Sequence, residues 1–148
     1  MTDMANPIFS KLSPLSLLTL ALWGEGRGES IEGRIAIGCV IRNRVDARKQ
    51  DYKTVLLAPQ QFSCFAPAGG DANYQAVLKA AEKNPLLDDV WAETAWIAGG
   101  VLTRQVRDVT GSATNYLTTQ LYLDHPPAWA LKCRVVKVVG SHTFLVEK

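Results

Sequence analysis

The sequence has few of the residues that bind metals or form disulfide frameworks. Its 148 residues include three cysteines and two histidines, with no Cys-x-x-Cys spacing. A structural zinc site needs four such ligands at suitable spacing, so we expect no metal site and no cofactor. The odd number of cysteines (Cys39, Cys64 and Cys133) also argues against a disulfide framework and predicts free thiols.

Long hydrophobic runs and a strong net charge are missing as well. The apolar stretch at residues 12–23 is shorter than the roughly 20 residues that cross a bilayer. Asp3 and a single Lys11 precede it, and no small-x-small cleavage site follows, so we expect no signal peptide and no membrane insertion. The net charge of +2 gives little reason to expect nucleic acid as a partner. We expect a monomer in the cytoplasm.

What is present is the composition of one globular domain. Apolar residues make up 47% of the chain and charged residues 20%, which are ordinary values for a globular protein. A chain of 148 residues is long enough to bury its own core. We found no internal repeat and no low-complexity segment, and we predict a single domain over residues 1–148.

Helix signals dominate the first third of the chain. Ser13-Pro14 provides an N-cap and a first helical residue, and the helix is predicted to run to about Trp23. Ser30 is the expected N-cap of a second helix, at residues 31–48, which is apolar on all sides in its middle. This pattern is typical of a buried central helix, in which Gly38 allows close packing.

Two further helices are predicted after a segment without regular pattern. Helix-breaking prolines and glycines predict that residues 53–70 are mostly loop. Asp71 is the expected N-cap of a third helix, which stops at Asn84-Pro85. The fourth has an apolar stripe over residues 87–101 and Arg104 in its last turn.

The end of the chain changes from helical to strand-like pattern. Residues 134–139 and 142–146 are rich in β-branched side chains and are separated by Gly140-Ser141, which indicates a hairpin. The predicted fold class is therefore α+β, with about four helices around a buried central helix and a small C-terminal antiparallel sheet.

Two carboxylates, those of Glu25 and Glu29, lie four residues apart in the segment where the first two helices are expected to meet. Trp23 can form an apolar wall beside Glu25, and desolvation raises the pKa of a carboxyl, as a general acid requires near neutral pH. The surrounding glycines would let a polymer approach the backbone. Taken alone, the segment also fits a glycine-rich helix end at which a solvated Glu25 pairs with Arg27.

Four blocks of sequence occur in a characteristic order. They are Trp23-Gly24-Glu25-Gly26-Arg27-Gly28-Glu29 followed by Asn43-Arg44-Val45, Gln61-Phe62-Ser63-Cys64, Thr110-Gly111-Ser112-Ala113-Thr114-Asn115-Tyr116, and Val139-Gly140-Ser141-His142-Thr143-Phe144. Together they resemble the SleB/CwlJ-type cell wall hydrolases over about residues 15–146.

This resemblance implies a fold like that of lysozymes and lytic transglycosylases, and an activity. The expected substrate is the glycan strand of bacterial peptidoglycan, cleaved at the β-1,4 bond between N-acetylmuramic acid and N-acetylglucosamine. By resemblance, Glu25 is the catalytic acid, and a 1,6-anhydro product is expected. Glu29 is a possible second carboxylate, but we expect it to contact substrate or to orient the turn.

The resemblance also implies substrate contacts. The candidates are Gln61, Ser63, Thr110, Asn115 and Tyr116. Asn115 stands where the family has histidine, and because an amide cannot take a proton we expect it to bind sugar only. The single domain and the absence of a recognisable export signal fit a phage endolysin that stays in the cytoplasm until a separate holin-type protein releases it to the cell wall.

Two other classes of function remain open from the sequence. A cysteine peptidase acting on the stem peptides would use Cys64 as nucleophile and His125 as base. A non-catalytic wall-binding module would not need Glu25 at all, so a change at Glu25 separates it from an enzyme.

Overall fold

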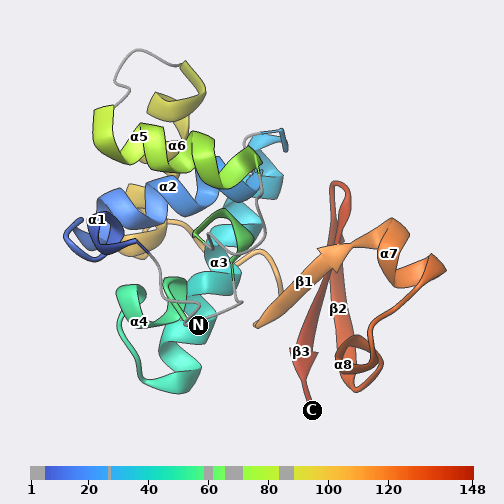
Figure 1. Cartoon of the computed structure of the whole chain (residues 1–148). Helices are drawn as coiled ribbons and strands as arrows, with labels where there is room; N and C mark the ends of the chain where they lie inside the picture. Colours follow the sequence, from blue (N-terminus) through green and yellow to red (C-terminus); the bar gives the residue numbers. More distant parts are fainter. Residues whose placement is uncertain (1–5, 27, 59–61, 66–71, 84–88) are drawn as a thin grey trace.

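In the computed structural model, which describes residues 6–26, 28–58, 62–65, 72–83 and 89–148, helices fill the first two thirds of the chain and the strands follow (Figure 1). The helices of the first part are α1 (Pro7–Ser10), α2 (Pro14–Gly26), α3 (Ile31–Arg48), α4 (Tyr52–Leu56), η1 (Ser63–Phe65), α5 (Ala72–Lys83) and α6 (Asp89–Leu102). The last part contains β1 (Asn115–Thr118), α7 (Thr119–Asp124), α8 (Ala128–Leu131), β2 (Cys133–Val139) and β3 (His142–Glu147).

Helix α2 is buried on nearly all sides and ends later than predicted. Ser13 caps it, since the Ser16 amide donates to the Ser13 hydroxyl at 3.1 Å. The predicted end at Trp23 is wrong, because the helix continues to Gly26. The reason is that Gly24 serves packing: an added Cβ there would lie 2.7 Å from a Val77 methyl carbon. Glu25 is therefore held by the last turn of a helix.

Helix α3 is the central helix that the sequence predicts. Ser30 caps it by accepting from the Gly33 amide at 3.1 Å, and Lys49 ends it in the left-handed conformation, with φ 53°. A Cβ on Gly38 would lie 2.9 Å from a Val101 methyl carbon, so the glycine lets α6 approach α3. The predicted bounds and the role of Gly38 are confirmed.

Two local predictions need correction, and a third is not tested. The segment 53–70 was expected to be mostly loop, but α4 overlaps it and η1 lies within it, because Asp51 caps α4 by accepting from the Thr54 amide at 2.8 Å. Arg104 lies beyond the end of α6 with φ 65°, where it pairs with Asp46 at 2.6 Å. The predicted cap at Asp71 lies outside the described residues.

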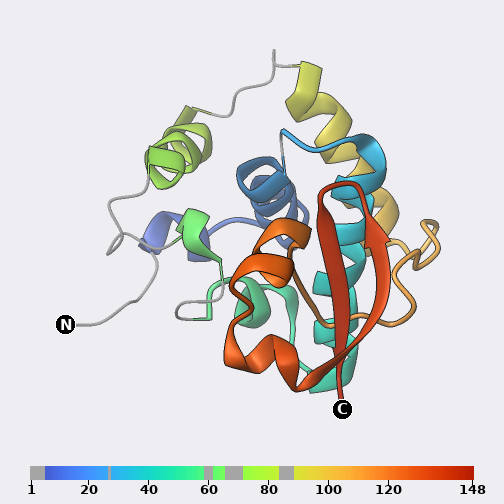
Figure 2. The ribbon, with the colours of Figure 1, turned by 90° about the vertical axis from the view of Figure 1, so that its right-hand side faces the viewer.

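The sheet has three antiparallel strands in the order β1-β3-β2. The β2–β3 hairpin is the one predicted, whereas β1 was missed because it is only four residues long. Tyr116 of β1 pairs with Phe144 of β3. Phe144 packs with Ala36 and Val40 of α3 in a small core, and Figure 2 shows the hairpin in front of α3, with its strands running along the helix.

The main core lies between α2, α3, α5 and α6, and buries leucine, isoleucine and phenylalanine side chains from these helices and from α1. Within the described residues, no helix is long and apolar enough to cross a membrane. The architecture is α+β, as predicted.

Candidate active site

A cleft of about 490 Å³ opens between the helices and the sheet. The helical part lines it with Glu25 of α2, Arg44 and Arg48 of α3, Phe62, and Ser63 of η1. The C-terminal part lines it with Asn115 and Tyr116 of β1, Trp129 of α8 and Glu147 of β3. The site is thus assembled from both parts of the fold, which are in contact through α3 and the strands β1 and β2.

Glu25 lies half-buried on the helical wall of this cleft. The backbone amide of Cys64 donates to its Oε1 at 3.5 Å. This contact depends on Gly24, because a Cβ at that position would lie 3.0 Å from the Cys64 Cβ. The glycine therefore lets η1 pack onto the end of α2 and brings a hydrogen-bond donor to the carboxyl group.

Tyr116 lies on the sheet wall and is electrostatically coupled to Glu25. Burial raises the pKa of Tyr116 far above its ordinary value, the negative charge of Glu25 raises it further, and Arg44 lowers it. The ring meets His142 edge-on, with centroids 5.3 Å apart. The phenol is therefore a neutral hydroxyl in the cleft near neutral pH.

Arg44 joins the two walls. Its Nε donates to the Thr114 carbonyl at 2.6 Å, and its guanidinium lies 5.4 Å from the centre of the Phe62 ring. Burial lowers the pKa of Arg44, the Tyr116 and Glu147 groups raise it, and Arg48 lowers it. Arg44 belongs to the motif Asn43-Arg44-Val45, but its place in the cleft was not predicted from the sequence.

Behind the cleft, Asn43 holds the loop that leads into β1. Its Nδ2 donates to the Ala113 carbonyl at 2.9 Å and to Asp108 Oδ2 at 3.2 Å. Thr110 is fully buried and its hydroxyl donates to Asp108 Oδ1 at 2.7 Å. The expected sugar contact at Thr110 therefore needs correction, because a buried side chain presents no surface to a substrate.

Glu29 is directed to the hairpin and does not line the cleft. Its Oε1 accepts from the Ser141 hydroxyl at 2.9 Å and lies 3.3 Å from His142 Nδ1. Gln61, another predicted contact, lies outside the described residues. The structure thus brings together Glu25, Ser63, Asn115 and Tyr116 of the predicted set, together with Arg48, Trp129 and Glu147.

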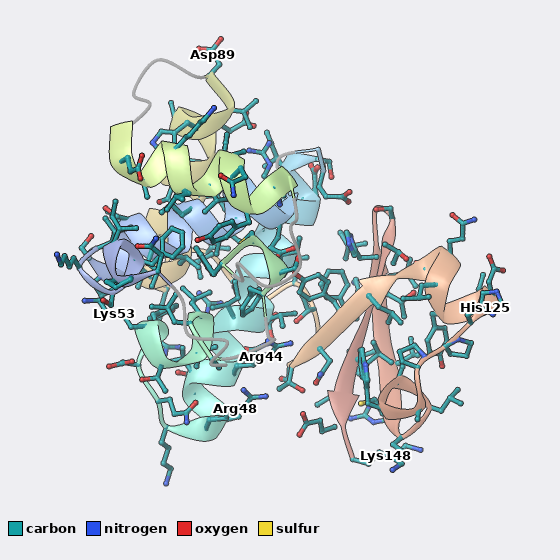
Figure 3. The ribbon with its side chains drawn as sticks, in the orientation of Figure 1. Arg44, Arg48, Lys53, Asp89, His125 and Lys148 are labelled. Carbon is teal, nitrogen blue, oxygen red and sulfur yellow. The ribbon has the colours of Figure 1, made fainter. Side chains whose placement is uncertain are left out.

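The pair required for a cysteine peptidase is not assembled. Cys64 is fully buried, whereas His125 is exposed after α7 and lies at the outer end of the sheet region (Figure 3). Among the described residues, no cluster of three or more His, Cys, Asp or Glu side chains could hold a metal ion.

A protein-family model described as Cell Wall Hydrolase matches residues 28–145. This chain belongs to the cell wall hydrolase family. The family and the fold together make it a peptidoglycan-degrading enzyme of the SleB/CwlJ type. The matched range begins beyond Glu25, so the assignment of that residue depends on its place in the cleft and on the motif around it.

This cell wall hydrolase is also similar to a solved structure, the catalytic domain of the germination-specific lytic transglycosylase SleB from Bacillus anthracis. The two share 22% sequence identity with a TM-score of 0.62, over 91% of this chain and 97% of the other. At this identity the similarity establishes the fold. A comparison with curated proteins gave no match.

Proposed function

We propose that this cell wall hydrolase is a lytic transglycosylase that cleaves the β-1,4 bond between N-acetylmuramic acid and N-acetylglucosamine, with Glu25 as its acid and base. The observation that supports this most is the place of Glu25. Its carboxyl is half-buried in a cleft formed between helices and sheet, with a backbone donor at 3.5 Å. A carboxyl group that lines a substrate-sized cleft is placed to give a proton to a bound glycan and to take one back.

The reaction needs one carboxyl group because the nucleophile belongs to the substrate. Protonated Glu25 gives its proton to the bridging oxygen as the bond from the muramoyl C1 to that oxygen breaks. The resulting carboxylate then takes the proton of the muramoyl 6-hydroxyl, whose oxygen bonds to C1. The product is a 1,6-anhydro sugar, Glu25 is protonated again, and no water is consumed.

Other cleft residues are suited to bind the sugars. Trp129 is 42% exposed on the sheet side of the cleft, and an indole ring gives a flat apolar surface for a sugar ring. Ser63 and Asn115 offer a hydroxyl and an amide in the same cleft. Thr114 donates to Asn115 Oδ1 at 2.8 Å, which orients the amide for binding rather than proton transfer.

A hydrolytic muramidase is the second candidate, because Glu147 places another carboxyl in the cleft. Glycosidases that use water need two carboxyl groups, one of them acting as base or nucleophile. Mass spectrometry of digested peptidoglycan separates the two reactions. A transglycosylase releases muropeptides lighter by one water than the reducing ones, and Glu147→Gln should keep that product. Reducing products that are lost in Glu147→Gln would favour the muramidase.

We further propose a role in lysis of a bacterial host, with a holin-type protein for release and with the enzyme acting as a monomer. The proposal is supported by the peptidoglycan-degrading family. Expression in a bacterium with and without a membrane-permeabilising protein tests it: lysis should require both proteins. Lysis by the enzyme alone would contradict the need for release.

A further inference from the structure

The cleft extends beyond Arg44 to a second guanidinium group. Arg48 is the last residue of α3, and it follows Arg44 by one helical turn, or about 6 Å along the helix axis. Both side chains line the same cleft as Glu25, and Figure 3 shows them on the side of α3 that faces the sheet.

The two arginines differ in how they are held. Arg44 is buried and bonded to the Thr114 carbonyl. Arg48 is exposed, and it makes no hydrogen bond or ion pair to another residue in the described part of the chain. A cleft-lining guanidinium without such a partner is available to a ligand.

Charge at this end of the cleft is unbalanced. The positive charge of Arg48 lowers the pKa of Arg44, while the negative charge of Glu147 raises it, so both groups lie within electrostatic reach of Arg44. When Glu25 is protonated, as its proposed role as acid requires, the cleft lining holds one carboxylate, Glu147, against two guanidinium groups. An anionic group of the substrate would correct this excess of positive charge.

The two arginines share one cleft with the proposed acid. Tyr116 is affected electrostatically by both Glu25 and Arg44, and Arg44 by Arg48. Tyr116 therefore lies close to both the acid and Arg44, and Arg48 lines the same cleft. A muramoyl residue at the acid would carry its lactyl substituent within the same cleft.

We propose that Arg48 is a specificity residue that binds a carboxylate on the muramoyl substituent of the glycan strand. A guanidinium group matches a carboxylate with two parallel hydrogen bonds, which a neutral substituent cannot accept as strongly. The proposal rests on the proposed function, since it takes the substrate to be a muramoyl glycan. The carboxylate has two possible sources: the lactyl group itself in strands stripped of peptide, or the stem peptide in intact strands.

The test uses three soluble strand preparations and the purified full chain. The first carries stem peptides, the second has been stripped by an amidase so that the lactyl carboxylate is free, and the third is the stripped strand with its carboxyls converted to methylamides. Arg48→Ala should lower kcat/KM about tenfold on carboxylate-bearing strands, mainly through KM. On the methylamide strand this loss of kcat/KM should disappear. On the carboxylate-bearing strands, Arg48→Lys should keep part of the kcat/KM that Arg48→Ala loses.

Lys79→Ala is the matched control, because Lys79 is an exposed cation of α5 that does not line the cleft. It should leave all three rates unchanged. A loss in Arg48→Ala on stripped strands identifies the lactyl carboxylate, and a loss confined to intact strands identifies the stem peptide. An equal loss on all three preparations, or no loss on any, overturns the proposal.

Binding of the same strands separates this proposal from the proposed function. If the parent protein cleaves no glycosidic bond, the proposed function fails, but the dissociation constants still test Arg48. The parent should then bind carboxylate strands more tightly than Arg48→Ala does, with no difference on the methylamide strand. Equal affinities of the two proteins for every strand would contradict a role in carboxylate recognition.

Discussion

The carboxylate of Glu29 lies 3.3 Å from the imidazole of His142 and accepts the Ser141 hydroxyl at 2.9 Å. Glu29 precedes α3, whereas Ser141 and His142 belong to the tip of the β2–β3 hairpin. His142 in turn meets the Tyr116 ring. The contact therefore ties the sheet wall of the cleft to the helical wall near Glu25.

Glu29→Gln should weaken this contact and lower the stability of the fold, while it should have less effect on kcat. Losing a charge-assisted contact of a mostly buried carboxylate is expected to cost about 1–2 kcal/mol of unfolding free energy. Denaturant unfolding measures that loss, and kcat should fall less than tenfold. Ser141→Ala, which removes one partner, should show a smaller change in the same direction. A kcat loss as large as that of a catalytic acid, at unchanged stability, would instead make Glu29 a catalytic carboxylate.

Asp108 should make stability depend on acid pH. Burial would raise its pKa, but hydrogen bonds from Thr110, Ser112 and Asn43 outweigh burial, so the pKa is lowered overall. A carboxyl with a lowered folded pKa stabilises the fold above its unfolded pKa of about 3.9, and this contribution is lost as pH falls through the folded pKa. Asp108→Asn should therefore be less stable than the parent at pH 7, by about 1–2 kcal/mol.

The difference between parent and Asp108→Asn should begin to shrink below about pH 4, where the carboxyl of the unfolded chain takes up a proton, and it should be lost once the pH falls through the lowered pKa of the folded carboxyl. Urea titrations at neutral and acid pH measure it. A difference that stays constant over this range would mean that the carboxylate charge does not hold the loop.

The three cysteines should be dispensable for activity. Cys39, Cys64 and Cys133 are free thiols in the structure, so activity should survive dithiothreitol. Cys64→Ala should keep glycan cleavage within a few-fold, because alanine retains the backbone amide that reaches Glu25. Abolition of activity in Cys64→Ala, with the fold intact by circular dichroism, would revive the cysteine peptidase hypothesis.

The sequence predicts those parts of the fold that depend on local signals. Ser13 and Ser30 identify two helix starts correctly because capping is encoded by the cap residue itself. The end of α2 was misplaced because Gly24 looks like a helix breaker, whereas its role is contact with Val77, which is far along the chain. Long-range packing of this kind leaves no local pattern.

The cleft was only partly predictable for the same reason. Glu25, Asn115 and Tyr116 belong to motifs, and the structure places them together. Arg48 and Glu147 reach the cleft only because the sheet packs against α3, and no spacing in the sequence relates them. Thr110 lies in a motif as well, but its hydroxyl is used by the loop that supports β1.

The most direct test of the account is the rate of peptidoglycan cleavage by Glu25→Gln. Glutamine keeps the size and hydrogen bonding of the side chain but has no titrating proton, so the rate should fall by about 10²–10⁴-fold, as for loss of a general acid–base. Thermal unfolding and strand binding should stay close to those of the parent, since the half-exposed carboxyl contributes little to the core. A folded Glu25→Gln protein that cleaves peptidoglycan at the parent rate would contradict the assignment of Glu25, and with it the proposed mechanism.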